Sequence, residues 1–302
     1  MSKGYSQKKT VSFLLLFIIL FLLSSVHAAN NSSSRKGFLW KVQSKTNITY
    51  IAGSIHAYKS ELFPLPKNME DAFDKSDVLA VEANINEIKP ESIMTMINGA
   101  FYQDGSMLEN HLSKETYEMT LKKLNELGLF PELFKNIKPW VIALTVTSID
   151  LQKLGLDPEH GIDKYFLKKA ENKKKIVELE SIDYQVNLLN SFSDTEQELF
   201  LVSAFGDLEL LKEEINEILN AWNQGDTKTM ESFVSKSLQD DLRMLPIYEK
   251  LIFERNKNMA SKIEGYLKTK DHYFVVVGAA HLVGKDGIIE ILKKKGYLVE
   301  QL

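Results

Sequence analysis

Two stretches near opposite ends of the chain decide the fold: Tyr50-Ile51-Ala52-Gly53-Ser54-Ile55-His56 and Val275-Val276-Val277-Gly278-Ala279-Ala280-His281. Each is an apolar run followed by Gly-x-x-His, which predicts a strand that presents a histidine at its carboxyl end. A glycine directly after a strand permits a tight turn or a close backbone approach, and this is the role expected of Gly53 and Gly278. Ligands bind at the carboxyl edge of the sheet in α/β proteins. We therefore predict that His56 and His281 meet at one edge of one sheet.

Other segments supply the rest of a sheet and its helices. Strands are predicted at 38–42 and 48–52, which form a hairpin, and at 78–81, 175–179, 273–277 and 297–299. Helices are predicted at 67–75, from a cap at Ser113 to Gly128, from a capping box at Ser193 to about Trp222, from Pro246 to about Leu267, and from about Asp286 to Lys295.

The predicted fold class is α/β (α+β), with a central mixed sheet built from N-terminal and C-terminal strands. A large helical insertion, over about residues 90–270, separates the two groups of strands. Residues 37–302 are predicted to form one domain.

The first 28 residues are predicted to be a secretory signal peptide. Three lysines precede an apolar run over residues 11–23, and small residues lead to a cleavage position after Ala28, with Ala29 as an alternative. The other interpretation is an uncleaved N-terminal segment that tethers the protein to a membrane. Residues 29–36 are expected to be a linker. The predicted location is secreted or periplasmic, with no stable membrane span after cleavage.

Composition excludes several function classes. The 302 residues carry 37 Lys plus Arg against 41 Asp plus Glu, and a net charge of −4 offers no basic surface for nucleic acid. The chain contains no cysteine, so disulfides, thiolate metal sites and cysteine nucleophiles are excluded. His-Glu-x-x-His, Gly-x-Ser-x-Gly and phosphate-loop motifs are also absent.

Two glutamates follow predicted strands in the same way as the histidines. Glu82 comes directly after 78–81, and Glu180 follows 175–179. A carboxylate buried at such a position is costly unless it is paired or coordinated, so the placement indicates a nearby cation. Two imidazoles with one or two carboxylates suit a divalent Mn, Co, Zn or Fe ion.

The ordered motifs of this chain resemble those of the TraB/GumN family, which is similar to the Tiki proteases. The resemblance spans about residues 37–302. It rests on Gly53–His56, Leu62–Pro66, Val81-Glu82, His160–Tyr165, Leu179–Ser181 to Gln185, Glu254–Asn256 to Ala260, and Val277–Gly284. The resemblance implies a metal-dependent hydrolase of peptidase type centred on the two histidines and the first glutamate. It also implies distant similarity to erythromycin esterase-like and haem-binding ChaN-like folds.

Chemistry suggests roles for the side chains of this site. His56, Glu82 and His281 are the predicted metal ligands, and a metal bound there would activate water for attack on a carbonyl. Glu180 is predicted to act as general base or fourth ligand. Asp163 is expected in the first turn of a helix, where a capping role is favoured over a catalytic one.

Two neighbouring side chains are predicted to contact the substrate. Arg255 would hold a substrate carboxylate or the developing oxyanion, with Asn256 as a neutral donor beside it; the other interpretation of Arg255 is an ion pair on a surface helix.

The predicted function is an exported hydrolase that cleaves peptide or amide bonds, and the partner is a peptide or small-molecule substrate. The alternative is a non-catalytic protein that binds a peptide, a metal or haem in the same cleft. These interpretations differ at Glu180 and Arg255, because a hydrolase needs a base and an oxyanion partner near the activated water, whereas a carrier needs only ligands.

Overall fold

A computed structural model of the chain describes residues 35–60 and 63–302. The predicted signal peptide and most of the predicted linker lie outside the described residues. Six strands form one sheet: β1 (Leu39–Gln43), β2 (Ile48–Ser54), β3 (Val78–Val81), β4 (Lys175–Glu178), β5 (Tyr273–Gly278) and β6 (Leu298–Gln301).

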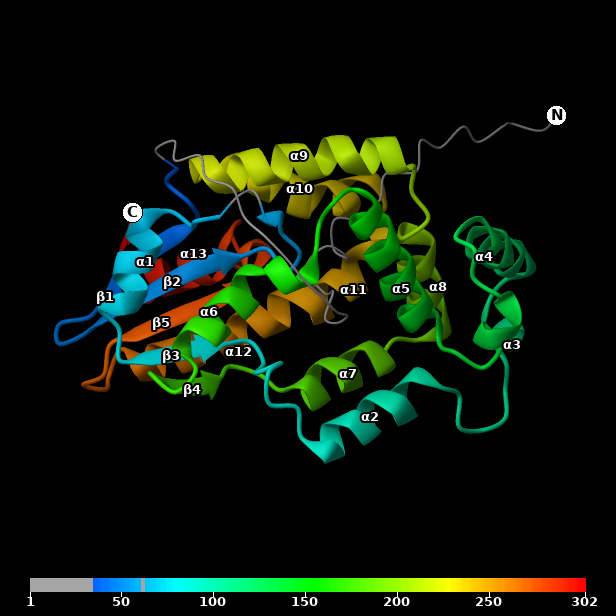
Figure 1. The fold of residues 1–302 in the computed structure, drawn as a ribbon, viewed down its shortest axis with the longest axis horizontal. Helices are drawn as coiled ribbons and strands as arrows, with labels where there is room; N and C mark the ends of the chain where they lie inside the picture. The colour runs from blue at the N-terminus through cyan, green and yellow to red at the C-terminus, as the bar shows by residue number, and fades with distance from the viewer. Residues whose placement is uncertain (1–34, 61–62) are drawn as a thin grey trace.

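The helices cover the sheet and fill the long interval between β3 and β5 (Figure 1). They are α1 (Lys67–Asp74), α2 (Pro90–Ala100), α3 (Leu108–His111), α4 (Lys114–Glu126), α5 (Pro139–Lys153), α6 (Ile162–Ala170), α7 (Ile182–Asn190), α8 (Asp194–Ser203), α9 (Leu208–Gln224), α10 (Thr227–Asp240), α11 (Leu245–Tyr248), α12 (Glu254–Tyr266) and α13 (Ile288–Lys294).

The sheet is mixed, with the strand order β4-β3-β5-β2-β1-β6. Neighbours from β4 to β2 pair in parallel, whereas β1 is antiparallel to both β2 and β6. The predicted hairpin is therefore confirmed as β1 and β2, and β2 lies directly beside β5 although more than 200 residues separate them in sequence. This pairing brings the two Gly-x-x-His segments to the same edge.

Burial follows the sequence pattern of each strand. Every residue of β3 and β5 is buried, as expected for continuous β-branched and apolar runs covered on both faces. The outer strands β4 and β6 keep several exposed residues. The two fully buried strands, β3 and β5, are neighbours in the sheet.

The helical insertion lies mostly to one side of the sheet, and α2 and α7 run together at its lower edge in Figure 1. A predicted continuous helix from Ser193 to about Trp222 is wrong: residues 204–207 separate α8 from α9. The physical reason is a new N-cap, because the Asp207 side chain accepts hydrogen bonds from the backbone N–H groups of Glu209 and Leu210.

The predicted fold class is confirmed: strands from both ends of the chain form most of the mixed sheet, β4 joins it from the middle, and helices make up the rest of the interval. Among the described residues, none of the helices has the length and apolar character needed to cross a bilayer.

Candidate functional site

Four strands bring their carboxyl ends to one edge of the sheet, in the order β4, β3, β5, β2. The registers Val81 with Glu178, Val81 with Val276, and Ser54 with Gly278 align these ends closely. The four predicted polar side chains follow the strand ends in the same order across the edge: Glu180, Glu82, His281 and His56. The predicted meeting of the two histidine motifs at one edge is thus confirmed.

His56 is held by a carboxylate from the helical insertion. Its Nδ1 atom lies 2.6 Å from Oδ2 of Asp163, in the first turn of α6, and both side chains are largely buried. Burial opposes a charge on this ring, but the Asp163 carboxylate outweighs burial and raises the pKa of His56 to about 9. Burial also opposes ionisation of Asp163, yet the neighbouring His56 keeps the pKa of that carboxyl below its ordinary value.

His281 is held in a different environment. It is 1% exposed, and its Nδ1 atom lies 2.6 Å from Oδ1 of Asn256 on α12. The Asn256 amide also donates to the backbone carbonyl of Asp286, which fixes the amide orientation. Burial, and then the positive charge of Arg255, holds the pKa of His281 well below its ordinary value. The two rings of the site therefore lie in different electrostatic surroundings: a carboxylate dominates at His56, whereas burial dominates at His281.

A buried guanidinium joins the two glutamates. The Nη2 atom of Arg255 donates to Oε2 of Glu82 at 2.6 Å and to Oε2 of Glu180 at 2.8 Å. Its Nε atom donates to both oxygens of Glu180, and its Nη1 atom donates to the backbone carbonyl of Leu251. The exposed fractions of Arg255, Glu82 and Glu180 are 4%, 6% and 9%. Arg255 is therefore the cation that the two buried carboxylates require.

Glu82 also connects the two glutamates with the segment Gly278–His281. Its Oε1 atom accepts a hydrogen bond of 2.7 Å from the backbone N–H of Gly278 and lies 3.8 Å from Nε2 of His281. The Gln185 amide on α7 donates to Glu180 at 3.0 Å and to Glu82 at 3.4 Å. One carboxylate thus touches the ends of β3 and β5 and the ring of His281.

Glycines allow the backbones of the site to approach one another. A Cβ atom on Gly53 would lie 3.0 Å from Phe38 and 3.1 Å from the Cα atom of Ala279. A Cβ atom on Gly161, the N-cap of α6, would lie 2.4 Å from the carbonyl oxygen of His56. Gly53 and Gly161 are therefore required by close packing, whereas Gly278 contributes its N–H group.

A π-helical turn at Glu249–Phe253 immediately precedes α12. Such a turn shifts the following side chains around the helix axis and leaves a carbonyl without its usual partner. Here the carbonyl of Leu251 accepts from the Arg255 side chain. The adjacent residues Arg255 and Asn256 then contact different partners, the glutamate pair and His281.

The nitrogen and oxygen atoms at this edge resemble the donor atoms of a divalent metal site. The Nδ1 atoms of both histidines are engaged by Asp163 and Asn256, an arrangement typical of metal-ligating histidines, and no described residue forms a hydrogen bond to either Nε2 atom. Two imidazole nitrogens with the nearby Oε1 of Glu82 suit a transition metal by their chemistry. Within residues 35–60 and 63–302, no group of three or more His, Asp or Glu side chains is arranged tightly enough to enclose an ion.

The structure brings together every side chain that the sequence singled out for this site. Asp163 was expected to cap a helix, and the structure instead directs its side chain to His56; its place in a first helical turn gave no sign of this contact. Gln185 was noted only within the family motif and proves to contact both glutamates. The interpretation of Arg255 as a surface ion pair is wrong, because its pairs are buried. The metal-ligand and catalytic roles stay predictions.

A sequence model of the TraB/PrgY/gumN family matches residues 38–301. The chain is 28% identical to the "Uncharacterized protein YbaP" of Escherichia coli (strain K12) over 248 residues, which cover 81% of this chain and 87% of that protein. It is 22% identical to "Metalloprotease TIKI1" of Xenopus tropicalis over 347 residues, which cover 95% of this chain and 66% of that protein. It is 24% identical to "Metalloprotease TIKI1" of Danio rerio over 324 residues, which cover 89% and 63%. No solved structure is significantly similar.

Proposed function

Because this chain belongs to the TraB/PrgY/gumN family, we propose that it is an exported metal-dependent hydrolase that cleaves peptide or amide bonds. The observation that carries this proposal is the pair of imidazoles at one sheet edge, each anchored through Nδ1 and each with an Nε2 atom that forms no hydrogen bond to a described residue. Similarity to proteins named metalloproteases supports the same reaction class.

His56, His281 and Glu82 are the side chains proposed to hold the metal. A divalent ion, when bound, supplies a Lewis acid for the scissile carbonyl and lowers the pKa of water. Asp163 and Asn256 fix the rotation of the two rings, so that both Nε2 atoms remain available as donors to a metal. Mn, Co, Zn and Fe remain the candidate ions.

Arg255 and Glu180 are proposed to position the carboxylate of Glu82. Arg255 pairs with Glu82, and Glu180 accepts hydrogen bonds from Nε and Nη2 of the same guanidinium. Since both oxygens of Glu180 accept from Arg255, Glu180 can take a proton from water only by giving up part of this pairing. We therefore propose Glu82 Oε1, which lies nearest to His281 Nε2, as the more available carboxylate oxygen.

A second candidate function is favoured by the same ion pairs. All three nitrogens of the Arg255 guanidinium already donate to Glu82, Glu180 or the carbonyl of Leu251, so this group is engaged within the protein rather than directed at a substrate. This arrangement supports a binding protein that holds a peptide, a metal or haem in the same site without turnover.

One experiment separates these functions. The protein is stripped with a chelator and reloaded with each candidate ion, and the bound metal is measured by mass spectrometry for wild type, His56→Ala, His281→Ala and the off-site control His272→Ala. We expect both site variants, but not the control, to lose the metal. Site variants that keep wild-type metal content while folded, as judged by circular dichroism, contradict the ligand assignment.

The same samples are then incubated with a mixed peptide library. We expect cleavage only by the metal-loaded wild type and the control. Metal binding without cleavage under any of the four ions supports the binding protein and overturns the hydrolase.

A further inference from the structure

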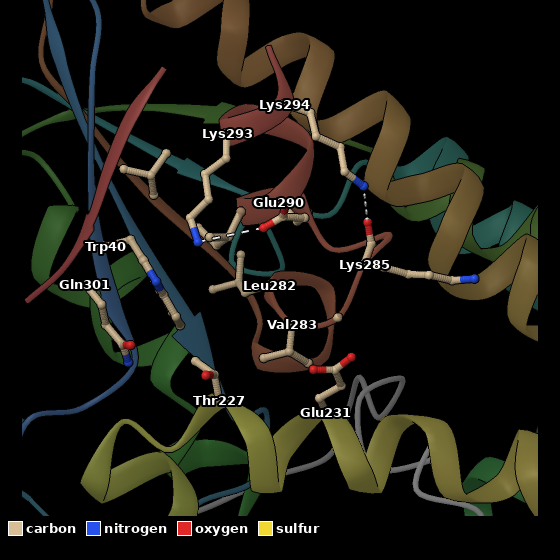
Figure 2. A pocket seen from close by; sticks show the side chains of 13 residues that line it. Trp40, Thr227, Glu231, Leu282, Val283, Lys285, Glu290, Lys293, Lys294 and Gln301 are labelled. Carbon is tan, nitrogen blue, oxygen red and sulfur yellow. Dashed lines mark hydrogen bonds and ion pairs between the residues drawn. The ribbon is translucent and has the colours of Figure 1, made fainter. Parts of the chain in front are cut away.

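A pocket of about 410 Å³ lies outside the site described above. It is lined by side chains from β1, β6, α10 and α13, and by the segment Leu282–Lys285 that directly follows His281 (Figure 2). Its volume falls within the range of small-molecule sites. None of the side chains proposed to bind metal or to act in hydrolysis lines this pocket.

One wall of the pocket contains an unpaired donor that solvent can reach. Trp40 on β1 is 3% exposed, and its indole N–H donates to no described residue. The other two tryptophans of the chain are satisfied: Nε1 of Trp140 donates to Asn190 at 3.2 Å, and Nε1 of Trp222 donates to the carbonyl of Gly53 at 2.7 Å. The Trp40 indole N–H is therefore available to an acceptor bound in the pocket.

Charged groups of opposite sign stand on different walls. Figure 2 shows Lys293 on α13 on the same side as Trp40, with Glu231 on α10 across the pocket beside Val283. Lys293 makes only a long contact with Glu290, 3.7 Å from Nζ to Oε2, which leaves donors on the ammonium. Glu231 forms no ion pair or hydrogen bond with a described residue. The pocket thus offers two donors on one side and a free carboxylate on the other.

We propose that this pocket binds a short peptide of two or three residues through its two charged ends. The C-terminal carboxylate would accept from Nε1 of Trp40 and Nζ of Lys293, and the N-terminal ammonium would donate to Glu231. Leu282 and Val283 supply an apolar wall for the peptide side chains. This assignment does not rest on the proposed hydrolase, because it uses none of the residues of that site.

A peptide bound in this pocket would also contact the residues that directly follow His281. Glu231 lies against Gly284, where an added Cβ atom would be 3.4 Å from Oε1 of Glu231, and Gly284 has a φ of +81°. A peptide ammonium on Glu231 would therefore touch the turn that begins at Leu282. The pocket and His281 share one short stretch of backbone.

The test is a titration of ¹⁵N-labelled protein with trialanine, in the presence of EDTA so that no metal-dependent cleavage consumes the peptide. The three indole N–H signals are assigned with Trp40→Phe, which removes the donor and keeps an aromatic ring. We expect saturable movement of the Trp40 signal, with much smaller changes at Trp140 and Trp222. Absence of movement up to millimolar peptide overturns the proposal.

Charge-deleted peptides and variants identify the contacts. N-acetyl-trialanine and trialanine amide are each expected to bind about tenfold more weakly or worse, because each loses one charge-assisted hydrogen bond. Glu231→Gln should weaken the binding of trialanine but not of N-acetyl-trialanine. Lys293→Gln should weaken the binding of trialanine but not of trialanine amide. The matched control is Lys122→Gln, an exposed lysine on α4 that does not line the pocket. Equal binding of all three peptides, or equal loss in the control, contradicts the assignment.

Discussion

The Nη2 atom of Arg255 lies 2.6 Å from Oε2 of Glu82, in the buried interior and at the end of β3. The same nitrogen reaches Glu180, so one side chain from α12 neutralises carboxylates at the ends of two strands. Glu82 in turn accepts from Gly278 and lies near His281. The segment Gly278–His281 and the ion pairs of Arg255 are therefore linked through Glu82.

Removal of the Arg255 guanidinium should lower the stability of the folded protein. Arg255→Met leaves Glu82 and Glu180 buried without their cation, and we expect a loss of about 3–5 kcal/mol in the free energy of unfolding. Denaturant unfolding at pH 7 measures it. Adding Glu180→Gln to Arg255→Met should recover part of the loss, since one uncompensated charge is removed. A loss below about 1 kcal/mol for the single variant would show that the ion pairs are unimportant for stability.

Asp163→Asn should weaken metal binding by about 10- to 100-fold, because Asp163 orients the ring of His56 and favours metal-ligating geometry. Competition with a coloured chelator measures the affinity. Asp183→Asn is the matched control, because Asp183 occupies the same position in the first turn of α7 and contacts Ser92 instead. Equal affinities for the two variants would remove Asp163 from the site.

Gly161→Ala should destabilise the protein by about 1–3 kcal/mol, because the new methyl group would meet the carbonyl of His56 at 2.4 Å and neither backbone can yield freely. Gly265→Ala on α12 meets nothing within 4 Å and should be neutral or stabilising by about 0.5–1 kcal/mol. Thermal unfolding of both variants checks the contrast. Similar melting temperatures would mean that α6 is not packed against the His56 loop.

Glu196 should make stability depend on pH. Burial opposes its charge, but the Lys250 ammonium and the N–H and hydroxyl of Ser193 outweigh burial and hold the pKa of Glu196 below its ordinary value. A carboxyl with a lowered folded-state pKa stabilises above its unfolded pKa, and this contribution disappears as the pH falls through the folded value. Glu196→Gln should therefore lower the free energy of unfolding by about 1 kcal/mol at pH 7 and by less at pH 3.

The control for this pH effect is Glu213→Gln, at an exposed position on α9. Urea unfolding at pH 7 and pH 3 should show no pH-dependent difference from wild type. A cost of Glu196→Gln that is unchanged between the two pH values would contradict the lowered pKa.

The sheet was predictable because its strands are β-branched runs with clear ends. The segment 78–81 was predicted with the bounds of β3, and the repeated Gly-x-x-His pattern indicated that β2 and β5 share an edge. Parallel pairing then places both histidines together, since carboxyl ends of parallel strands meet. Local sequence and strand direction were enough for this part of the site.

Other features depend on contacts that sequence spacing does not encode. Asp163 has the position of a helix-capping acid, and only the packing of α6 against the His56 loop gives it a second partner. Arg255 follows a π-helical turn that apolar periodicity does not reveal. The break before α9 depends on Asp207, whose capping role was hidden within an otherwise helical pattern.

The most direct test of the central proposal is a crystal of the protein loaded with cobalt and measured at the cobalt absorption edge. We expect one anomalous peak within about 2.0–2.2 Å of both Nε2 atoms, of His56 and His281. A peak that touches only one of these rings, or none, would contradict the shared metal site.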